Sequence, residues 1–312
     1  MRNLIEEAAL RLQELQAMGS ADPWPDILPA DRSPPPRVGA AVMPIVPRVV
    51  PPTSRTARRI DIDFRVLSAR GMLTPETARP QLAAEYRILK RPLIRHALGK
   101  HCAPTPHGRF VMVTSAQRGE GRTFTAVNLA MSIAMDTDQP VLLIDADVSN
   151  PSVSELFGLP PGPGLLDVLA GTAELSDALL RTQIDGLSVL PIGDANVRAT
   201  ELIASGTMRS LLDNLSACDP DLMLIFDAPP LLAATEAREL ASHMGQLIVV
   251  VEADRTAQSQ VREALSIVEG VPERMLVLNG ARRLRAGGDY DASPRPDKKS
   301  PAPEEAVEVE GR

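Results

Sequence analysis

One short stretch of the sequence has the residue types and spacing of a phosphate-binding loop. Residues 115–123 read SAQRGEGRT, between the apolar run FVMVTS and the helix-like run AVNLAMSIAM. Gly119 and Gly121 permit tight backbone turns, and N–H groups at the start of the following helix would point at a phosphate. Thr123 supplies the hydroxyl that ligates Mg²⁺ in such loops. The stretch therefore predicts binding of a phosphorylated ligand.

The loop departs from the usual G-x-x-x-x-G-K-[ST] pattern at two positions. Ala116 replaces the first glycine, and Arg122 replaces the lysine. Taken alone, the stretch is about as compatible with a chance glycine turn as with a nucleotide site.

Three carboxylates favour the nucleotide site. VLLIDADVSNP places Asp145 and Asp147 at the end of one apolar run, and LMLIFDAPP places Asp227 at the end of another. Ligands of open α/β sheets bind at the carboxyl ends of the strands, and unpaired charge is costly there. Any one of these acids would be explained as the cap of a following helix. All three beside a phosphate loop predict a Mg²⁺–nucleotide site.

These residues need a sheet to position them, and residues 108–281 predict one. Near-continuous Val/Ile/Leu runs alternate with helical segments, which is typical of a parallel sheet covered on both faces. We therefore predict an α/β fold of the P-loop NTPase type, with a mostly parallel sheet. The expected strands are 109–115, 139–147, 187–193, 221–229, 246–254 and 274–280, and helices are expected over TFTAVNLAMSIAM, MRSLLDNLSAC and SQVREALSIVEG.

Three further segments have simpler patterns. Residues 1–20 predict an amphipathic interaction helix, although packing of this helix on its own domain is equally compatible with the pattern. Residues 21–58 are rich in proline and predict a semi-extended linker, with a proline-recognition ligand the less favoured interpretation. Residues 282–312 lack aliphatic periodicity and predict a disordered tail.

Residues 59–107 predict a helical arm in front of the sheet domain. IDIDFRVLSARGMLTPE suggests a short strand or turn leading into a loop, with Thr74-Pro75-Glu76 as a helix start. QLAAEYRILKRPLIRHALG then predicts one basic helix, bent near Pro92.

Composition limits the class of protein. A chain of 312 residues with 44% apolar residues can bury a sizeable core, and the net charge of −7 argues against a general nucleic-acid binder. Cys102 and Cys218 form no disulfide framework, which indicates a reducing compartment. No apolar run is long enough to span a membrane, and the N-terminus lacks the pattern of a signal peptide. We therefore expect a cytoplasmic chain.

The three motifs together resemble those of the bacterial tyrosine kinases of exopolysaccharide export. These kinases are relatives of the deviant P-loop ATPases that position division septa and partition plasmids. Gly119-Glu120-Gly121 and Asp227-x-Pro229-Pro230 match the kinase branch, whereas the partitioning ATPases carry a lysine where this chain has Gln117. Segments such as GMLTPE, YRILKRPL, GLLDVLAG and RATELIAS look like the exosortase-associated autokinase subgroup. The resemblance covers roughly residues 60–281 and the short N-terminal helix.

The resemblance implies a role for each site residue. Asp145 would orient or activate the attacking group, Asp147 would help to hold Mg²⁺, and Asp227 would reach the metal directly or through water. Asn279 would lie near the adenine, although a turn-forming Asn before a glycine is an equal local explanation. The implied nucleotide-binding residues are Gln117, Arg118, Gly119, Glu120, Gly121, Arg122, Thr123, Phe124 and Asn279; the implied catalytic residues are Arg122, Asp145 and Asp147; the implied metal ligands are Thr123, Asp145 and Asp227.

Two departures from the family pattern concern charge at the site. Arg122 keeps the positive charge of the usual lysine but presents it on a planar fork. Because phosphoryl transfer depends on positioning and charge stabilisation, a displaced charge would lower the rate more than the binding. The basic residue that commonly follows the Asp-x-Asp pattern is absent, and Ser149 and Asn150 occupy that stretch.

Two more departures concern assembly and substrate. The family's helix motif for ring assembly, Glu-x-x-Arg-x-x-Arg, is only partly present, because Ala84 and Lys90 flank the matching Arg87. The kinases phosphorylate tyrosine clusters in their own tails, but this chain has two tyrosines. Tyr86 lies in a predicted helix, so Tyr290, with an acid on each side, is the sole tail acceptor.

The sequence thus predicts a Mg²⁺–ATP-dependent protein-tyrosine autokinase of exopolysaccharide synthesis or export, which transfers the γ-phosphoryl group to Tyr290 of a neighbouring subunit. The implied partner is a chain-length-determining (co-polymerase) inner-membrane protein, which would keep the self-associating kinase peripheral to the inner membrane. The alternative is an ATP-binding regulatory subunit without catalysis, favoured by Arg122 and the single tail tyrosine. A partitioning-type ATPase is less favoured because of Gln117.

Overall fold

The computed structural model describes residues 58–76, 79–99, 107–137, 139–194 and 198–281. Every described residue belongs to one compact unit, Ile45–Arg312. The predicted N-terminal helix, the predicted linker up to residue 57 and the predicted tail with Tyr290 lie outside the described residues. In the described part, no helix is both long enough and apolar enough to cross a membrane.

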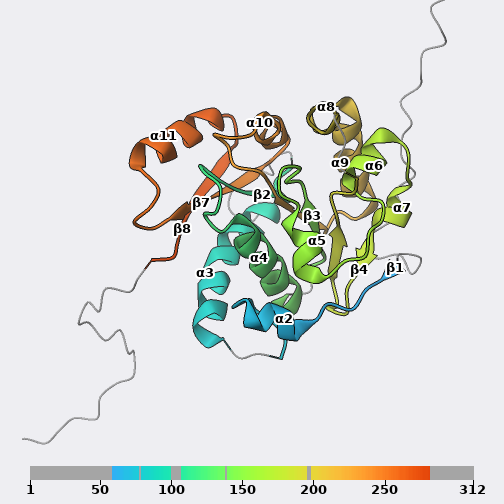
Figure 1. The fold of residues 1–312 in the computed structure, drawn as a ribbon, viewed down its shortest axis with the longest axis horizontal. Coiled ribbons are helices and arrows are strands. Elements are labelled where there is room, and N and C mark those ends of the chain that lie inside the picture. The colour runs from blue at the N-terminus through green and yellow to red at the C-terminus, as the bar shows by residue number, and fades with distance from the viewer. Residues whose placement is uncertain (1–57, 77–78, 100–106, 138, 195–197, 282–312) are drawn as a thin grey trace, which may run out of the picture. The chain divides into compact units, whose positions relative to one another are not determined.

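An eight-stranded sheet forms the centre of the described unit, with the order β1-β4-β5-β3-β6-β2-β7-β8 (Figure 1). All neighbouring strands are parallel except β4 and β5. All six predicted strands are present, and the predicted α/β fold with a mostly parallel sheet is confirmed. The strands are β1 (Arg58–Arg59), β2 (Phe110–Ser115), β3 (Val141–Asp145), β4 (Leu180–Arg181), β5 (Leu187–Leu190), β6 (Met223–Asp227), β7 (Gln246–Glu252) and β8 (Glu273–Asn279).

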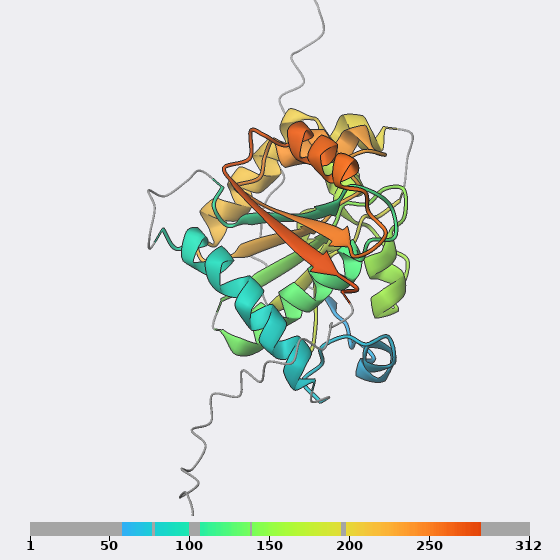
Figure 2. The ribbon, with the colours of Figure 1, turned by 90° about the vertical axis from the view of Figure 1, so that its left-hand side faces the viewer.

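Helices cover both faces of this sheet (Figure 2). One layer packs around the long helix that follows the phosphate loop, and it consists of α2 (Phe64–Ala69), α3 (Pro80–Ala97), α4 (Arg122–Asp136) and α5 (Ser152–Phe157). The other layer consists of α6 (Leu165–Ala170), α7 (Leu175–Ala178), α8 (Ala199–Ile203), α9 (Gly206–Cys218), α10 (Thr235–Ala241) and α11 (Gln258–Ile267).

Each central strand contributes to both hydrophobic layers, because successive side chains of a strand point to opposite faces. In β2, Val111 and Val113 pack on the α4 side, whereas Phe110 and Met112 pack on the α9 side. All four are at most 2% exposed. This two-sided burial is the reason that the strands are apolar throughout instead of alternating with polar residues.

Residues 60–76 differ from the prediction. Instead of a strand or turn leading into a loop, they contain the helix α2, and the predicted helix start at Thr74 is wrong. Asp63 caps α2 by accepting the N–H of Arg65 at 2.8 Å. The next helix, α3, begins at Pro80. A six-residue helix is too short to display a helical period, which explains why the sequence pattern missed it.

The predicted basic helix is present as α3, with Pro92 inside it. Lys90 points inward from α3: its Nζ donates to the carbonyl oxygen of Ser132 at 2.5 Å and to Asp136 at 2.7 Å, both on α4. Tyr86 is also buried, at 6% exposure. The helical arm that the sequence predicts in front of the domain therefore packs into the same core as α4.

Candidate functional site

The carboxyl ends of three adjacent strands bring the predicted site residues together. Asp145 at the end of β3 is in register with Asp227 at the end of β6, and Asp227 is in register with Val113 of β2. The phosphate loop begins directly after β2 and runs into α4 at Arg122. The site therefore forms where a mostly parallel sheet is expected to bind ligands.

The glycines of the loop adopt the conformations that the motif requires. Gly119 has a φ of 84° and Gly121 a φ of 96°, both in the left-handed region that favours glycine. Gly121 is the residue before α4, so the first N–H groups of the helix are available to a bound anion. The loop backbone thus has the positive-φ turns and the open helix start that a phosphate site requires, although Ala116 replaces the first glycine of the usual pattern.

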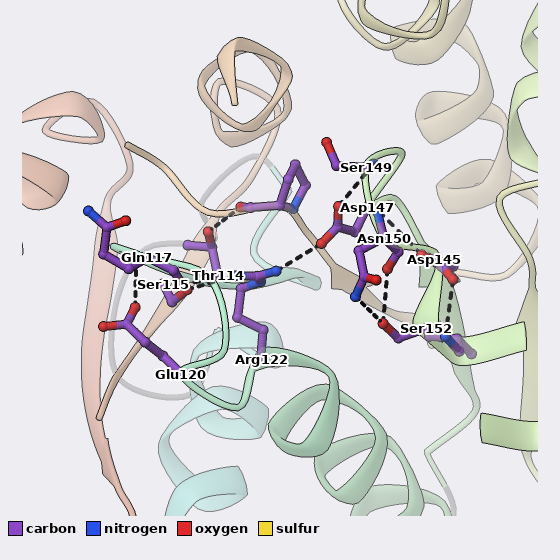
Figure 3. Close-up of polar contacts among 12 residues, drawn as sticks. Thr114, Ser115, Gln117, Glu120, Arg122, Asp145, Asp147, Ser149, Asn150 and Ser152 are labelled. Carbon is purple, nitrogen blue, oxygen red and sulfur yellow. Dashed lines mark hydrogen bonds and ion pairs between the residues drawn. The ribbon is translucent and has the colours of Figure 1, made fainter. Parts of the chain in front are cut away.

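Arg122 is folded back into the loop (Figure 3). One terminal nitrogen donates to Ser115 Oγ at 3.0 Å and to the carbonyl oxygen of Gln117 at 3.1 Å, and the other donates to Asp147 at 2.8 Å. The side chains of Arg122 and Asp147 are only 7% and 3% exposed. A planar fork can contact both sides at once, so the arginine closes the loop against the end of β3.

Asp145 and Asp147 are both held by backbone N–H groups. Asp147 accepts from Ser149 and Asn150, each at 3.1 Å, in addition to Arg122. Asp145 accepts from Asp147 and, at the start of α5, from Val153, each at 3.2 Å. Burial, followed by the neighbouring charge of Asp227, raises the pKa of Asp145 well above its ordinary value. The capping alternative raised by the sequence therefore applies to Asp145.

Asp227 is the carboxylate without such partners. It is fully buried, and within the described residues neither oxygen has a hydrogen bond of normal geometry. Burial raises its pKa to about 7, against smaller opposing effects of the Thr123 hydroxyl and the Arg122 guanidinium nearby. A buried polar group without partners calls for a ligand, an ion or a proton.

The residues around Asp227 fit a Mg²⁺ ion that is bound together with phosphates. The described residues contain no group of three or more His, Cys, Asp or Glu side chains placed to hold a metal by themselves. Mg²⁺ does not need such a group, because it is usually held by one or two carboxylates together with substrate phosphates and water. Asp227 and the neighbouring Thr123 provide a carboxylate and a hydroxyl.

Other predicted site residues lie at the margins. Arg118 is exposed at the loop, and Phe124 packs partly into the core beside α3. Asn279, at the end of β8, donates from Nδ2 to the carbonyl oxygen of Glu120 at 3.0 Å. Thr256, which donates to the Glu120 carboxylate, was not predicted, and nothing in its local sequence marks it.

Comparison with known proteins identifies the family of this chain. Residues 107–278, more than half of the chain, match the ParA family, described as NUBPL iron-transfer P-loop NTPase. The tyrosine-protein kinase YwqD of Bacillus subtilis (strain 168) is 33% identical over 184 residues, which cover 58% of this chain and 76% of that kinase. The chain belongs to the bacterial tyrosine-kinase family of P-loop NTPases.

Two other members of the bacterial tyrosine-kinase family are also similar to this chain. The putative tyrosine-protein kinase EpsB of Ralstonia nicotianae is 33% identical over 172 residues, although the chain spans only 22% of the length of EpsB. The solved kinase domain of Escherichia coli tyrosine kinase ETK is similar with a TM-score of 0.57 and 25% identity, over 75% of this chain and 94% of that domain. The predicted family is confirmed, and the exosortase-associated subgroup stays a prediction.

Proposed function

We propose that the chain is a Mg²⁺–ATP-dependent protein-tyrosine kinase whose site lies at the carboxyl ends of β2, β3 and β6. The observation that carries the proposal is Asp227, a fully buried carboxylate beside the phosphate loop for which the described residues offer no hydrogen bond of normal geometry. Membership of the tyrosine-kinase family supplies the reaction class.

The residues divide the work of phosphoryl transfer among binding, charge and orientation. Backbone N–H groups from Gly119 to Thr123 would cradle the β- and γ-phosphates, and Arg122 would neutralise charge that develops during transfer. Asp227 and Thr123 would hold Mg²⁺, which supplies charge neutralisation on the phosphate oxygens when bound. Asp145, in register with Asp227 at the neighbouring strand end, would orient the attacking hydroxyl or accept its proton.

The acceptor in this proposal is Tyr290 of a neighbouring chain. Tyr86 is buried, and desolvation raises the pKa of its hydroxyl, so it presents no accessible nucleophile. The sequence contains only these two tyrosines, which leaves Tyr290 as the tail acceptor. A single phosphotyrosine adds at most about two negative charges, so the resulting switch is small compared with that of a tyrosine cluster.

The biological setting is proposed from the family resemblance. The chain would work in exopolysaccharide synthesis or export, together with a co-polymerase protein of the inner membrane that holds it at the membrane periphery. Its self-association would bring Tyr290 of one chain to the site of the next.

A second candidate function is a regulatory subunit that binds ATP without transferring phosphate. The Arg122–Asp147 ion pair favours it, because the γ-phosphate would have to compete with a buried carboxylate for the same guanidinium. If the guanidinium stays paired with Asp147, it cannot stabilise the negative charge of the transition state, although the loop backbone still binds phosphates.

The two functions are separated by incubating the full-length protein with labelled Mg²⁺–ATP. A kinase yields phosphotyrosine that is lost in both Tyr290→Phe and Asp145→Ala, whereas Tyr86→Phe retains it if its fold is intact. ATP binding without phosphotyrosine, even with the cytoplasmic segment of the membrane partner present, would exclude the kinase and support the regulatory subunit. An Arg122→Lys variant completes the set, because a large gain in turnover would identify the arginine as a brake.

A further inference from the structure

Glu120 lies within the phosphate loop, yet its side chain is turned into the protein. It is 2% exposed, and both carboxylate oxygens are used. One oxygen accepts the N–H of Gln117 at 2.7 Å (Figure 3), and the other accepts the hydroxyl of Thr256. Hydrogen bonds to a buried carboxylate are strong, and losing one leaves a costly charge. Glu120 therefore fixes the path of the loop from inside.

Thr256 reaches Glu120 from a separate segment, the turn that follows β7. Its hydroxyl oxygen accepts the N–H of Glu252 at 3.2 Å, so the single hydroxyl proton is directed to Glu120. The turn is closed by the N–H of Thr256, which donates to the carbonyl oxygen of Glu252 at 3.1 Å. The hydroxyl is thus held in place by its own segment.

Asn279 attaches the same loop residue to β8. The side chain of Asn279 donates to the Glu120 carbonyl oxygen, and the backbone carbonyl oxygen of Asn279 accepts the N–H of Ala253 at 2.8 Å, which joins the ends of β7 and β8. A Cβ atom at Gly121 would collide with the side-chain amide of Asn279. Gly121 is therefore required both for its positive φ and for this close approach. The loop is tied to two strand ends on the side away from Asp145.

We propose that Thr256 is a positioning residue for the nucleotide phosphates and acts through Glu120. The inference rests on the proposed binding of ATP by the loop. Thr256 holds the Glu120 carboxylate on the N–H of Gln117, which keeps the loop in the conformation with Gly119 and Gly121 at positive φ in front of α4. Without this bond, the carboxylate is free to leave Gln117, and the loop must be reordered when phosphates bind.

The test compares Thr256→Val, which removes the hydroxyl at nearly constant shape, with Thr256→Ser, which keeps it. Calorimetry on the full-length protein measures the affinities for Mg²⁺–ATP and for AMP, which lacks the β- and γ-phosphates. We expect Thr256→Val to weaken ATP binding by about tenfold, the effect of one lost bond to a charged group, and AMP binding much less. Thr256→Ser should restore the affinity for ATP.

A double-mutant cycle with Glu120→Gln checks the route. The effects of Thr256→Val and Glu120→Gln on ATP affinity should not add, because a glutamine has one acceptor oxygen for the two donors that Glu120 binds and so already weakens the contact that Thr256→Val removes. If Thr256→Val fails to fold, Glu120→Gln takes its place and must weaken ATP more than AMP. Unchanged ATP affinity in Thr256→Val, equal weakening of ATP and AMP, or additive effects would overturn the inference.

The outcomes also separate this inference from the proposed function. Wild-type protein that binds no Mg²⁺–ATP would overturn both. Tight ATP binding that is insensitive to Thr256→Val would overturn only the positioning role. Failure to form phosphotyrosine bears on the kinase alone, because every measurement here is of binding.

Discussion

Arg122 joins the phosphate loop to Asp147, just after β3, through two terminal nitrogens, whereas a lysine has a single terminal nitrogen. It is one member of a buried ion pair with Asp147, and it also donates to Ser115 and to the backbone of the loop. Breaking a buried pair from one side leaves an uncompensated charge, which costs far more than breaking an exposed pair. The arginine is therefore structural in the ligand-free protein, whatever it does with phosphate.

The buried ion pair predicts a stability loss at Arg122. Arg122→Ala should lower the free energy of unfolding by about 3 kcal/mol, because Asp147 is left buried and charged. Arg255→Ala is the matched control: Arg255 pairs with Glu252 at the same distance of 2.8 Å, but its side chain is 68% exposed. It should cost less than about 1 kcal/mol. Urea unfolding measures both, and equal losses would contradict the structural role of Arg122.

Asp227 makes stability depend on pH. Burial raises its pKa from 3.8 to about 7, so between these values the folded protein keeps a proton that the unfolded chain has lost. Stability rises with pH only where the unfolded state binds more protons, so here it falls as pH increases through this window. This rise in the pKa of Asp227 from 3.8 to about 7 corresponds to about 4 kcal/mol at most. The raised pKa of Asp145 acts in the same direction.

The corresponding prediction is that Asp227→Asn flattens this profile. Relative to the wild type, its free energy of unfolding without nucleotide should improve steadily from about pH 4 to about pH 7, because the asparagine has no proton to lose. The cost of burying an amide is independent of pH and cancels in the comparison of slopes. Asp185→Asn removes the same formal charge from an exposed position and serves as the control. Parallel profiles for wild type and Asp227→Asn would refute the assignment.

At the scale of elements, the sheet could be predicted from the sequence because burial on both faces produces strands that are apolar at nearly every position. Strands such as Val141–Asp145 are apolar throughout, and the acids that end them marked the site. The helix α2 shows no such pattern, since it has only 6 residues and is defined by its cap and by the buried Leu67. The bonds from Thr256 to Glu120 and from Arg122 to Asp147 join residues 136 and 25 positions apart. No local pattern encodes contacts of that separation.

The contact between α3 and α4 is also one that no local sequence pattern encodes. Lys90 stands where the family's assembly motif has its last arginine, yet its side chain is 5% exposed and bonds within the chain to Asp136 and to the backbone of Ser132. Its ammonium group is thus committed to holding α3 on α4. Sequence alignment to a surface motif could not show this inward direction.

Lys90→Met should therefore destabilise the protein although it keeps the apolar stem. The loss of two charged hydrogen bonds predicts about 2–3 kcal/mol in the free energy of unfolding. Arg87→Met, on the same helix but exposed, provides the control and should stay within about 0.5 kcal/mol. Chemical denaturation of both variants is sufficient, and a neutral Lys90→Met would show that α3 is held by its apolar contacts alone.

At the scale of the described unit, the two hydrophobic layers share their strands. Residues of β2, β3, β6 and β7 alternate between the α4 side and the α9 side, so neither layer can lose its strands without exposing the other. The site lies at the ends of these same strands. A ligand bound there contacts strands that contribute side chains to both layers. Its binding energy should therefore stabilise the unit as a whole.

Nucleotide binding should therefore shift a single unfolding transition. At an ATP concentration one hundred times its Kd, the free energy of unfolding should rise by about 2.7 kcal/mol, with near-UV and far-UV signals moving together. Chelation of Mg²⁺ should reduce this gain in the wild type but have little effect in Asp227→Asn, which lacks the carboxylate proposed to hold the ion. Two transitions, of which only one responds to ATP, would mean that the layers unfold independently. Because the layers share every central strand, we expect one.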